Sequence, residues 1–472
     1  MNRPLWTSEE AAAATGGESR GAWSASGLSI DTRTLAPGDL FVALTAERDG
    51  HDFVADAFAR GAAAALVARV PNGVDDDAPL LLVDDVLAGL GQMASDARSR
   101  FGGKVLAITG SVGKTTTKDM ARVALSGQMR VHAAEASYNN HWGVPLTLAR
   151  LDPDAQVAVI EIGMNHPGEI APLARLARPD VALVTTIAPA HLEAFASVEE
   201  IAREKATIFE GLGTGGTAIV PADSPNLEIL AEAARARTSD IRRVGFADAA
   251  DYRLDTVELR AGSTIVQARA GDLALVFRLG GAGRHFAPNA LSVLAAAEAL
   301  GGDMVLSGHA LAEWQPSAGR GTREFVALDP VEDAMIELID DAFNANPASM
   351  GAALDALIAS DPGPDGRRVA ILGDMLELGA DEMALHAAIA SHPGLDAVDL
   401  VHCAGPRIRA AWEALPELRR GVWTERAEEL AGRVAGLVRP GDIVLVKGSK
   451  GARTARVVDA IRKLGHRERR TA

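Results

Sequence analysis

A short glycine-bearing loop, placed between an apolar run and a helical run, constrains the fold of this chain more than any other feature. The run "KVLAIT" at 104–109 is typical of a buried strand, "GSVG" follows it, and "KTTTKDMARVALSG" then has the apolar spacing of a helix. Backbone N–H groups of a tight loop and of a helix N-terminus attract phosphate, and Lys114 adds a positive charge there. Thr115 offers a hydroxyl that can hold Mg²⁺.

The loop lacks one part of the usual phosphate-loop pattern. That pattern has a glycine five positions before its Gly-Lys pair, where this chain has Ile108, and the first glycine here is Gly110. Three interpretations remain open, namely a broken P-loop, a chance glycine turn, or a shorter variant with its own chemistry. The flanking strand and helix favour phosphate binding over a chance turn.

Chain length and the order of apolar runs predict three domains. At about 100–200 residues per domain, 472 residues form two to four domains. From residue 104, and again after the glycine-rich "AGRGTREF", short runs rich in Val and Ile alternate with helical segments, which indicates parallel sheets covered by helices. We expect domains at 1–101, 102–319 and 320–472, the last two of α/β class. The alanine-rich "RGAAAALVAR" in the first domain is predicted to be helical.

Charge and composition limit the partners and the compartment. The formal net charge of −16 disfavours broad contact with nucleic acid or anionic lipid. Cys403 is the only cysteine, which excludes an internal disulfide and fits a reducing cytosol. The N-terminus lacks the apolar core of a signal peptide, and no apolar run approaches the ~20 residues that span a bilayer. We therefore expect a cytoplasmic protein with no membrane insertion and no nucleic-acid partner.

Polar residues are predicted to lie at the ends of two strands beside the loop. Glu161 ends the apolar run "VAVIE", and "VALVTTIAPAHLE" is expected to carry the next strand to His191 and Glu193. Ligands of open α/β sheets bind at the carboxyl ends of strands, and a buried acid is costly unless it is paired or bound to a metal. The pair indicates a metal site, with a turn-capping acid and an ordinary loop histidine as the alternatives.

Lys205 falls on the apolar face of a predicted helix in "SVEEIAREKATIFEGL". Burial of an unpaired ammonium is expensive, so this position needs an explanation. One explanation is that the ammonium reaches water along its aliphatic stem. The other is a lysine beside a nucleotide and metal site, with a chemically altered amine.

In their order along the chain, these motifs and several others resemble the Mur ligase family, the ATP-dependent amide-forming enzymes of peptidoglycan assembly. The family's phosphate loop has the short form "TGSVGKTTT", so Ile108 is not a defect. The resemblance covers nearly the whole chain and rests on the motifs "SIDTRTLAPGDLFVAL", "DGHDF", "SYNNHWGVPLTL", "EIGMNHPGEI", "AHLE", "REKATIF", "GRHFAPNALSVLAAAEALG", "AGRGTRE", "IDDAFNANPASM", "LGDMLELG" and "VKGSKG".

The resemblance implies a three-domain fold and a specific reaction. A small N-terminal α/β domain would bind the UDP-sugar, a central P-loop parallel-sheet domain would bind ATP, and a C-terminal Rossmann-like domain would contribute to both nucleotide and amino-substrate binding. "DDAFNANPASM" and "GDMLELG" resemble the family member that adds D-alanyl-D-alanine to UDP-N-acetylmuramoyl-tripeptide through an acyl phosphate, and the Asp-Asn-Pro-Arg signature of the diaminopimelate-adding member is absent from the sequence. ATP and Mg²⁺ are the implied cofactors, and we expect a monomer.

The resemblance also assigns residues around the nucleotide. The phosphates and Mg²⁺ would be held by Gly110, Ser111, Val112, Gly113, Lys114, Thr115 and Thr116, with Glu161 and His191 lining the metal sites. Asn289 would face the adenine, and Arg320 and Asp341 would approach the nucleotide from the domain junction and the last domain. Lys205 matches a lysine that is carbamylated in many relatives. Lys114, His191 and Lys205 are therefore the expected catalytic residues.

Further residues are assigned to the other two substrates. The sugar nucleotide and its peptide would contact Asp31, Thr32, Arg33, Asn139, Asn140 and His141, and the amino-substrate side would be shaped by Asn344, Asn346 and Pro347. This chain departs from the family pattern at Ala194, Ala196 and Trp142 and in its final "GSKG". Other ligases of the superfamily, such as folylpolyglutamate synthase or the diaminopimelate-adding member, are the nearest alternatives. A nucleotide-dependent switch protein and a simple kinase are the alternative functions from other classes of protein.

Overall fold

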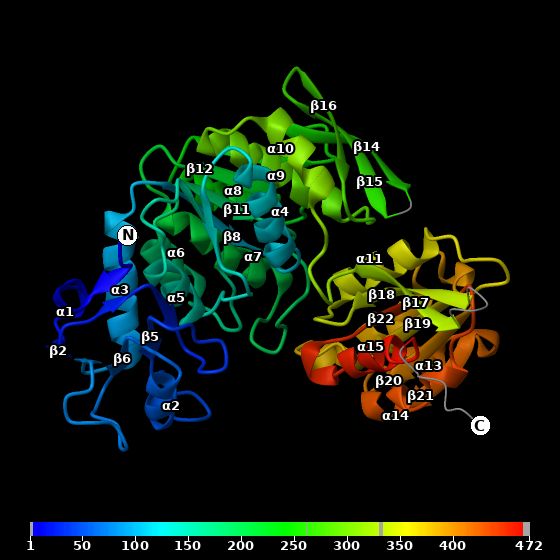
Figure 1. Cartoon of the computed structure of the whole chain (residues 1–472). Coiled ribbons are helices and arrows are strands. Elements are labelled where there is room, and N and C mark those ends of the chain that lie inside the picture. The colour runs from blue at the N-terminus through cyan, green and yellow to red at the C-terminus, as the bar shows by residue number, and fades with distance from the viewer. Residues whose placement is uncertain (1–2, 261, 330–333, 466–472) are drawn as a thin grey trace.

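The computed structural model of the chain describes residues 3–260, 262–329 and 334–465. Its strands form three main sheets that follow one another along the chain, each covered by helices (Figure 1). A short ribbon of β1 (Trp6–Thr7) and β3 (Ser24–Ala25) accompanies the first sheet. The predicted α/β class is confirmed. Within the described ranges, no helix combines the length and the apolar character needed to cross a membrane.

The first sheet has five strands, four of them parallel, with β2 antiparallel at one edge. Its strands, in spatial order, are β2 (Glu18–Arg20), β7 (Leu80–Leu82), β6 (Ala64–Val67), β5 (Asp39–Val42) and β4 (Gly27–Ser29). Its helices are α1 (Ser8–Thr15), α2 (Val54–Ala59) and α3 (Val86–Arg100). The helix predicted for "RGAAAALVAR" is wrong, because β6 lies there, fully buried between β5 and β7. Pairing on both edges outweighs the helix propensity of alanine at this position.

The central sheet has nine strands and carries the phosphate loop. It is parallel from β9 to β14 and ends in an antiparallel hairpin series. Its strands, in spatial order, are β16 (Leu273–Leu279), β15 (Ser263–Ala270), β14 (Tyr252–Arg260), β13 (Asp240–Gly245), β12 (Thr217–Pro221), β11 (Val181–Val184), β8 (Lys104–Thr109), β10 (Val157–Glu161) and β9 (Val131–Ala133). Its helices are α4 (Lys114–Ser126), α5 (Gly143–Ala149), α6 (Ile170–Ala177), α7 (Val198–Ala206), α8 (Leu227–Arg235), α9 (Phe286–Leu300) and α10 (Met304–Ala310).

The last sheet has six strands, parallel except for its edge strand β17. Its strands, in spatial order, are β17 (Thr322–Asp329), β18 (Ala334–Asp341), β22 (Ile443–Lys447), β19 (Arg368–Gly373), β20 (Leu400–Ala404) and β21 (Arg420–Thr424). Its helices are α11 (Pro347–Ile358), α12 (Glu382–Ala387), α13 (Arg409–Ala414), α14 (Ala427–Ala431) and α15 (Ala455–Arg462).

The first two sheets share a hydrophobic core, whereas the last sheet has its own. One buried cluster runs continuously from Trp6 through helix α3 into the central helices, as far as Ala234. The Trp6 indole N–H also donates to the Ala149 carbonyl (2.8 Å). Both faces of the last sheet are covered by clusters made only of residues after position 320. Movement of this last part against the rest is therefore the default expectation. We propose the boundaries near 101 and 320, which fall between the three sheets, as the domain boundaries.

Candidate active site

The phosphate loop connects the end of β8 to the first residue of α4, and two of its glycines cannot be replaced without strain. Gly110 and Gly113 have φ angles of 150° and 91°, in the region that favours glycine. A Cβ at Gly110 would lie 1.8 Å from Thr185 Oγ1, and one at Gly113 would lie 2.9 Å from the Asn289 amide. The loop therefore sits tightly between the ends of β11 and α9, with its backbone N–H groups at the N-terminus of α4.

Residues directly after β11 brace this loop. The Thr185 hydroxyl donates to the Val112 carbonyl (2.7 Å), and the Ser111 N–H donates to the Thr186 carbonyl (2.8 Å). The prediction that this strand continues to His191 is wrong, because β11 ends at Val184 and the next residues leave the sheet to hold the loop. Sequence reasoning missed Thr185, since an isolated threonine after a strand carries no signal of its own.

Lys114 is folded back onto the loop that it follows. Its ammonium donates to the Gly110 carbonyl (2.7 Å). Burial lowers the pKa of Lys114 and the charge of Arg320 adds to this, whereas the Glu161 carboxylate opposes it. The ammonium can exchange this carbonyl for a phosphate oxygen, because a backbone carbonyl holds a cation less strongly than an anion does. Thr116, in the first turn of α4, is buried.

Thr115, Glu161 and Asn139 converge on one carboxylate oxygen. The Thr115 hydroxyl (3.0 Å) and the Asn139 amide (2.6 Å) both donate to Glu161 Oε1. Glu161 is only 4 % exposed, and its Oε2 has no hydrogen-bond partner among the described residues. A buried carboxylate oxygen without a partner, beside a hydroxyl, offers the hard oxygen ligands that Mg²⁺ prefers, so the site fits this ion. The structure thus brings Thr115 and Glu161 together, and their role as metal ligands stays a prediction.

Two residues that sequence reasoning missed hold this group in place. Ser137 Oγ lies 3.0 Å from Thr115 Oγ1 and accepts a hydrogen bond from Arg320 (3.3 Å). Lys118 is 1 % exposed and donates to the Ala134 carbonyl (2.7 Å), which fixes the segment that carries Ser137. Its spacing of four residues from Lys114 was the available signal, because it puts both lysines on one face of α4.

Lys205 is buried on helix α7 with 1 % exposure, so the interpretation that its ammonium reaches water is wrong. Burial, followed by the positive charge of Lys114, lowers the pKa of Lys205 well below the usual lysine range. The structure gives its side chain no hydrogen bond or ion pair within the described ranges. Burial therefore disfavours the charged form of this amine.

Replacing Lys205 by methionine is expected to stabilise the protein in CO₂-free buffer. Because the folded chain binds a proton on this amine less tightly than the unfolded chain does, the free energy of unfolding of the native protein rises with pH up to about 10.4. Lys205→Met lacks this dependence. Its Tm should be higher by a few degrees near neutral pH, since about 1 kcal/mol shifts Tm by roughly 2–4 °C in a domain of this size. Differential scanning calorimetry against pH would measure the difference, which should shrink toward alkaline pH; an unchanged or lower Tm would contradict it.

His191 lies in the loop after β11 and contacts the last domain instead of Glu161. Its Nδ1 is 2.6 Å from Glu377 Oε2, and this contact lowers the pKa of Glu377. Within the described ranges, no hydrogen bond or ion pair joins His191 to Glu161. The expected role of His191 in lining a metal site therefore stays a prediction.

The residues expected near the nucleotide and the amino substrate lie at the junction with the last domain. Asp341 pairs with Lys447 (2.8 Å) at the adjoining ends of β18 and β22, and burial raises its pKa while Lys447 opposes the change. Arg320 lies 4.1 Å from the centre of the Phe343 ring. Asn289 is buried against Gly113, and its expected contact with adenine stays a prediction.

The asparagines of "FNANP" have structural partners of their own. The Asn344 carbonyl accepts a hydrogen bond from Lys447 (2.9 Å). Asn346 caps helix α11, accepting from the Ser349 N–H (2.9 Å), and Pro347 is the first residue of that helix. These contacts shape the carboxyl edge of the last sheet, and a role in substrate binding stays a prediction.

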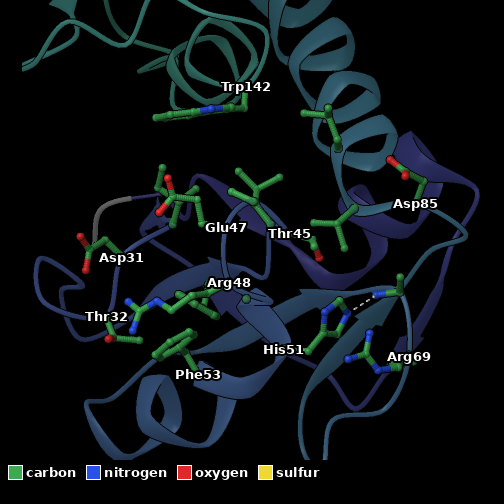
Figure 2. A pocket seen from close by; sticks show the side chains of 18 of the residues that line it. Asp31, Thr32, Thr45, Glu47, Arg48, His51, Phe53, Arg69, Asp85 and Trp142 are labelled. Carbon is green, nitrogen blue, oxygen red and sulfur yellow. Dashed lines mark hydrogen bonds between the residues drawn. The ribbon is translucent and has the colours of Figure 1, made fainter. Parts of the chain in front are cut away.

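A cavity of about 1050 Å³ lies between the first sheet and the start of helix α5. Asp31, Thr32, Arg33 and His141 line it, as does Trp142. Figure 2 shows the Trp142 indole on the opposite side of the cavity from Arg48 and Phe53. Arg48 lies 4.6 Å from the centre of the Phe53 ring, whereas Arg33 pairs with Asp31 (2.5 Å).

Asn140 was expected to contact the peptide in the same region. Its side-chain oxygen accepts from the Gly143 N–H (2.9 Å) and so fixes the start of α5. Asn139, one residue earlier, donates its side-chain amide to the Glu161 carboxylate instead.

Comparison with known proteins places these features in a family. Residues 108–297 match the Mur ligase middle domain, and residues 328–450 match the Mur ligase, glutamate ligase domain. UDP-N-acetylmuramoyl-tripeptide–D-alanyl-D-alanine ligase of Escherichia coli (strain K12) is 36% identical over 93% of this chain and 94% of its own length. A crystal structure of MurF from Acinetobacter baumannii superposes with a TM-score of 0.83 at 29% identity, covering 97% of this chain and 99% of that one. MurF ligase from Thermotoga maritima in complex with ADP gives a TM-score of 0.77 at 26% identity, over 93% and 98% of the two chains. This chain therefore belongs to the Mur ligase family.

Proposed function

We propose that this chain is an ATP-dependent ligase that adds D-alanyl-D-alanine to UDP-N-acetylmuramoyl-tripeptide in the synthesis of peptidoglycan precursors. The observation that carries the proposal is the group of side chains beside the phosphate loop. Thr115 and Asn139 both donate to Glu161 Oε1, and Glu161 Oε2 has no hydrogen-bond partner among the described residues. The names of relatives aligned over nearly the full chain supply the substrates. A cytoplasmic location and a monomeric state stay predictions.

The sugar nucleotide would occupy the 1050 Å³ cavity on the first domain. Arg48, stacked on Phe53, has no ion pair within the described ranges and is free to meet a diphosphate. The Trp142 indole on the opposite side offers a flat apolar surface to a ring of the ligand. The tripeptide would then extend past His141 toward the phosphate loop.

The first chemical step activates the carboxylate of the tripeptide. One carboxylate oxygen attacks the γ-phosphorus of ATP, and the bond from that phosphorus to the β–γ bridging oxygen breaks, which gives an acyl phosphate and ADP. Lys114 and the N–H groups of the loop would stabilise the charge that builds on the γ-phosphoryl oxygens. Thr115 and Glu161 would hold Mg²⁺, which neutralises phosphate charge when bound.

The second step forms the amide. The amine of D-alanyl-D-alanine, after its ammonium form has lost a proton, attacks the acyl carbon. The C–O bond to phosphate breaks, and a second proton leaves the nitrogen. Asp341, Asn344 and Asn346 lie at the carboxyl edge of the last sheet, where they would shape the site for this substrate. His191 and Asp341 are the candidate bases.

Lys205 would act as a carbamate. Its amine, whose pKa is lowered by burial, would attack CO₂ in its neutral form, form an N–C bond and release one proton. The product is a buried carbamate anion, and an anion can bind or orient a metal near Lys114.

Phosphate release measured with UDP-N-acetylmuramoyl-tripeptide and a panel of amines tests the proposed substrates. We expect ATP-dependent release that requires D-alanyl-D-alanine, with an amide product of the corresponding mass. Release with another amine, such as glutamate or diaminopimelate, and none with D-alanyl-D-alanine would overturn the assignment. A nucleotide switch would release phosphate without forming an amide.

A further inference from the structure

A close contact between His191 Nδ1 and Glu377 Oε2 (2.6 Å) joins two domains across 186 positions of sequence. His191 belongs to the central part of the chain, and Glu377 to the "GDMLELG" segment of the last part. The His191 side chain is 20% exposed and that of Glu377 is 55% exposed. Both residues have left-handed backbone angles, with φ of 57° and 63°, which are uncommon for residues other than glycine. Uncommon backbone angles persist where the surrounding structure enforces them, often at functional sites.

The two residues before Glu377 hold its segment in place through backbone hydrogen bonds. The Met375 N–H donates to Nε2 of the buried His386 (2.9 Å), and the Leu376 N–H donates to Ser449 Oγ (2.9 Å). His386 uses its other nitrogen on the Glu382 carbonyl (2.6 Å). The backbone position of Glu377 is therefore set by the fold of the last domain.

A second contact shows that the two segments lie directly against each other. Gly379 has a φ of 69°, and a Cβ there would lie 2.9 Å from the Leu192 carbonyl oxygen and 3.4 Å from the Glu193 nitrogen. A larger residue at position 379 would separate the segments. The His191–Glu377 pair thus sits in a close interdomain contact, which distinguishes it from an isolated surface ion pair.

We propose that Glu377 is a positioning residue that fixes the proton on Nδ1 of His191 and leaves Nε2 as the nitrogen available to the reaction. A carboxylate only accepts hydrogen bonds, and its oxygen lies 2.6 Å from Nδ1, which favours a proton on that nitrogen. Histidines that bind a metal commonly donate their other N–H to a carboxylate, which sets both the tautomer and the ring orientation. Because Glu377 belongs to the last domain, His191 is correctly oriented only when that domain is docked. The effect on catalysis rests on the proposed function, whereas the effect on the tautomer does not.

Nitrogen-15 NMR of histidine-labelled protein at mildly alkaline pH tests the tautomer directly. The His191 signal is identified by its loss in His191→Gln. We expect the Nδ1–H tautomer in the native protein and a shift toward the Nε2–H tautomer in Glu377→Ala, with Glu377→Gln intermediate because its amide oxygen still accepts. Asp355→Asn, which changes the His392–Asp355 pair (3.0 Å) within the last domain, is the matched control and should leave the His191 signal unchanged.

Kinetics on the same variants supplies the second measurement. Glu377→Ala should lower kcat of phosphate release by about 10–100-fold, the usual effect of losing a carboxylate behind a functional histidine. KM for ATP should stay the same, and Glu377→Gln should recover part of the loss. An unchanged tautomer in Glu377→Ala, or an altered tautomer with full kcat, would overturn the proposal. If the proposed substrates are wrong, native protein releases no phosphate with them and the NMR result still decides the positioning role.

Discussion

Replacing Lys114 by methionine is expected to lower kcat of ATP-dependent phosphate release by about 10²–10³-fold, the usual loss when one donor that stabilises transition-state charge is removed. Its ammonium is the cation folded onto the phosphate loop through the Gly110 carbonyl. Methionine keeps the length and the apolar stem of lysine and removes the charge. Steady-state phosphate release at saturating substrates measures the change.

Lys104→Met is the matched control for this experiment. Lys104 is exposed at the start of β8, the strand that ends at the phosphate loop, and its ammonium lies 3.4 Å from the Ala299 carbonyl. The Lys104→Met variant should keep nearly full kcat. Equal rates in Lys114→Met and Lys104→Met would show that Lys114 does not act on the phosphates.

Replacing Lys205 by alanine is expected to lower kcat by about 10²-fold or more, and short carboxylic acids added to the assay should restore part of it. The truncated side chain leaves a space among buried residues near Lys114, where a small carboxylate can take the place of the carbamate. Rescue should therefore increase with the acid concentration until the space is filled. The dependence of kcat on formate and acetate measures it.

Arg203→Ala controls for damage to helix α7. Arg203 lies on the exposed face of the same helix, two residues before Lys205. The Arg203→Ala variant should therefore keep its activity without added acid. Full activity of Lys205→Ala would end the carbamate hypothesis. Loss without rescue would leave Lys205 as a residue needed for packing.

The features predictable from sequence were those with a local pattern. The strand, glycine loop and helix around Lys114 could be predicted, because periodicity and turn chemistry act within a few residues. Burial of Lys205 followed from the apolar stripe of α7, and the position of Glu161 from its place at the end of a strand. The structure has all three as expected.

The features that could not be predicted depend on partners far along the chain. Strand β6 was mistaken for a helix because only its neighbours β5 and β7 make it a strand. Ser137 gains its role through Thr115 and Arg320, which no local pattern connects. Glu377 faces His191 only because two domains meet there.

Transfer of an oxygen label tests the central claim most directly. UDP-N-acetylmuramoyl-tripeptide labelled with ¹⁸O in its terminal carboxylate is incubated with ATP, Mg²⁺, D-alanyl-D-alanine and the native protein, and the released phosphate is analysed by mass spectrometry. If the carboxylate attacks the γ-phosphorus at the Lys114 loop, the phosphate carries one labelled oxygen and the peptide gains an amide. Unlabelled phosphate formed alongside the amide would contradict the acyl-phosphate route.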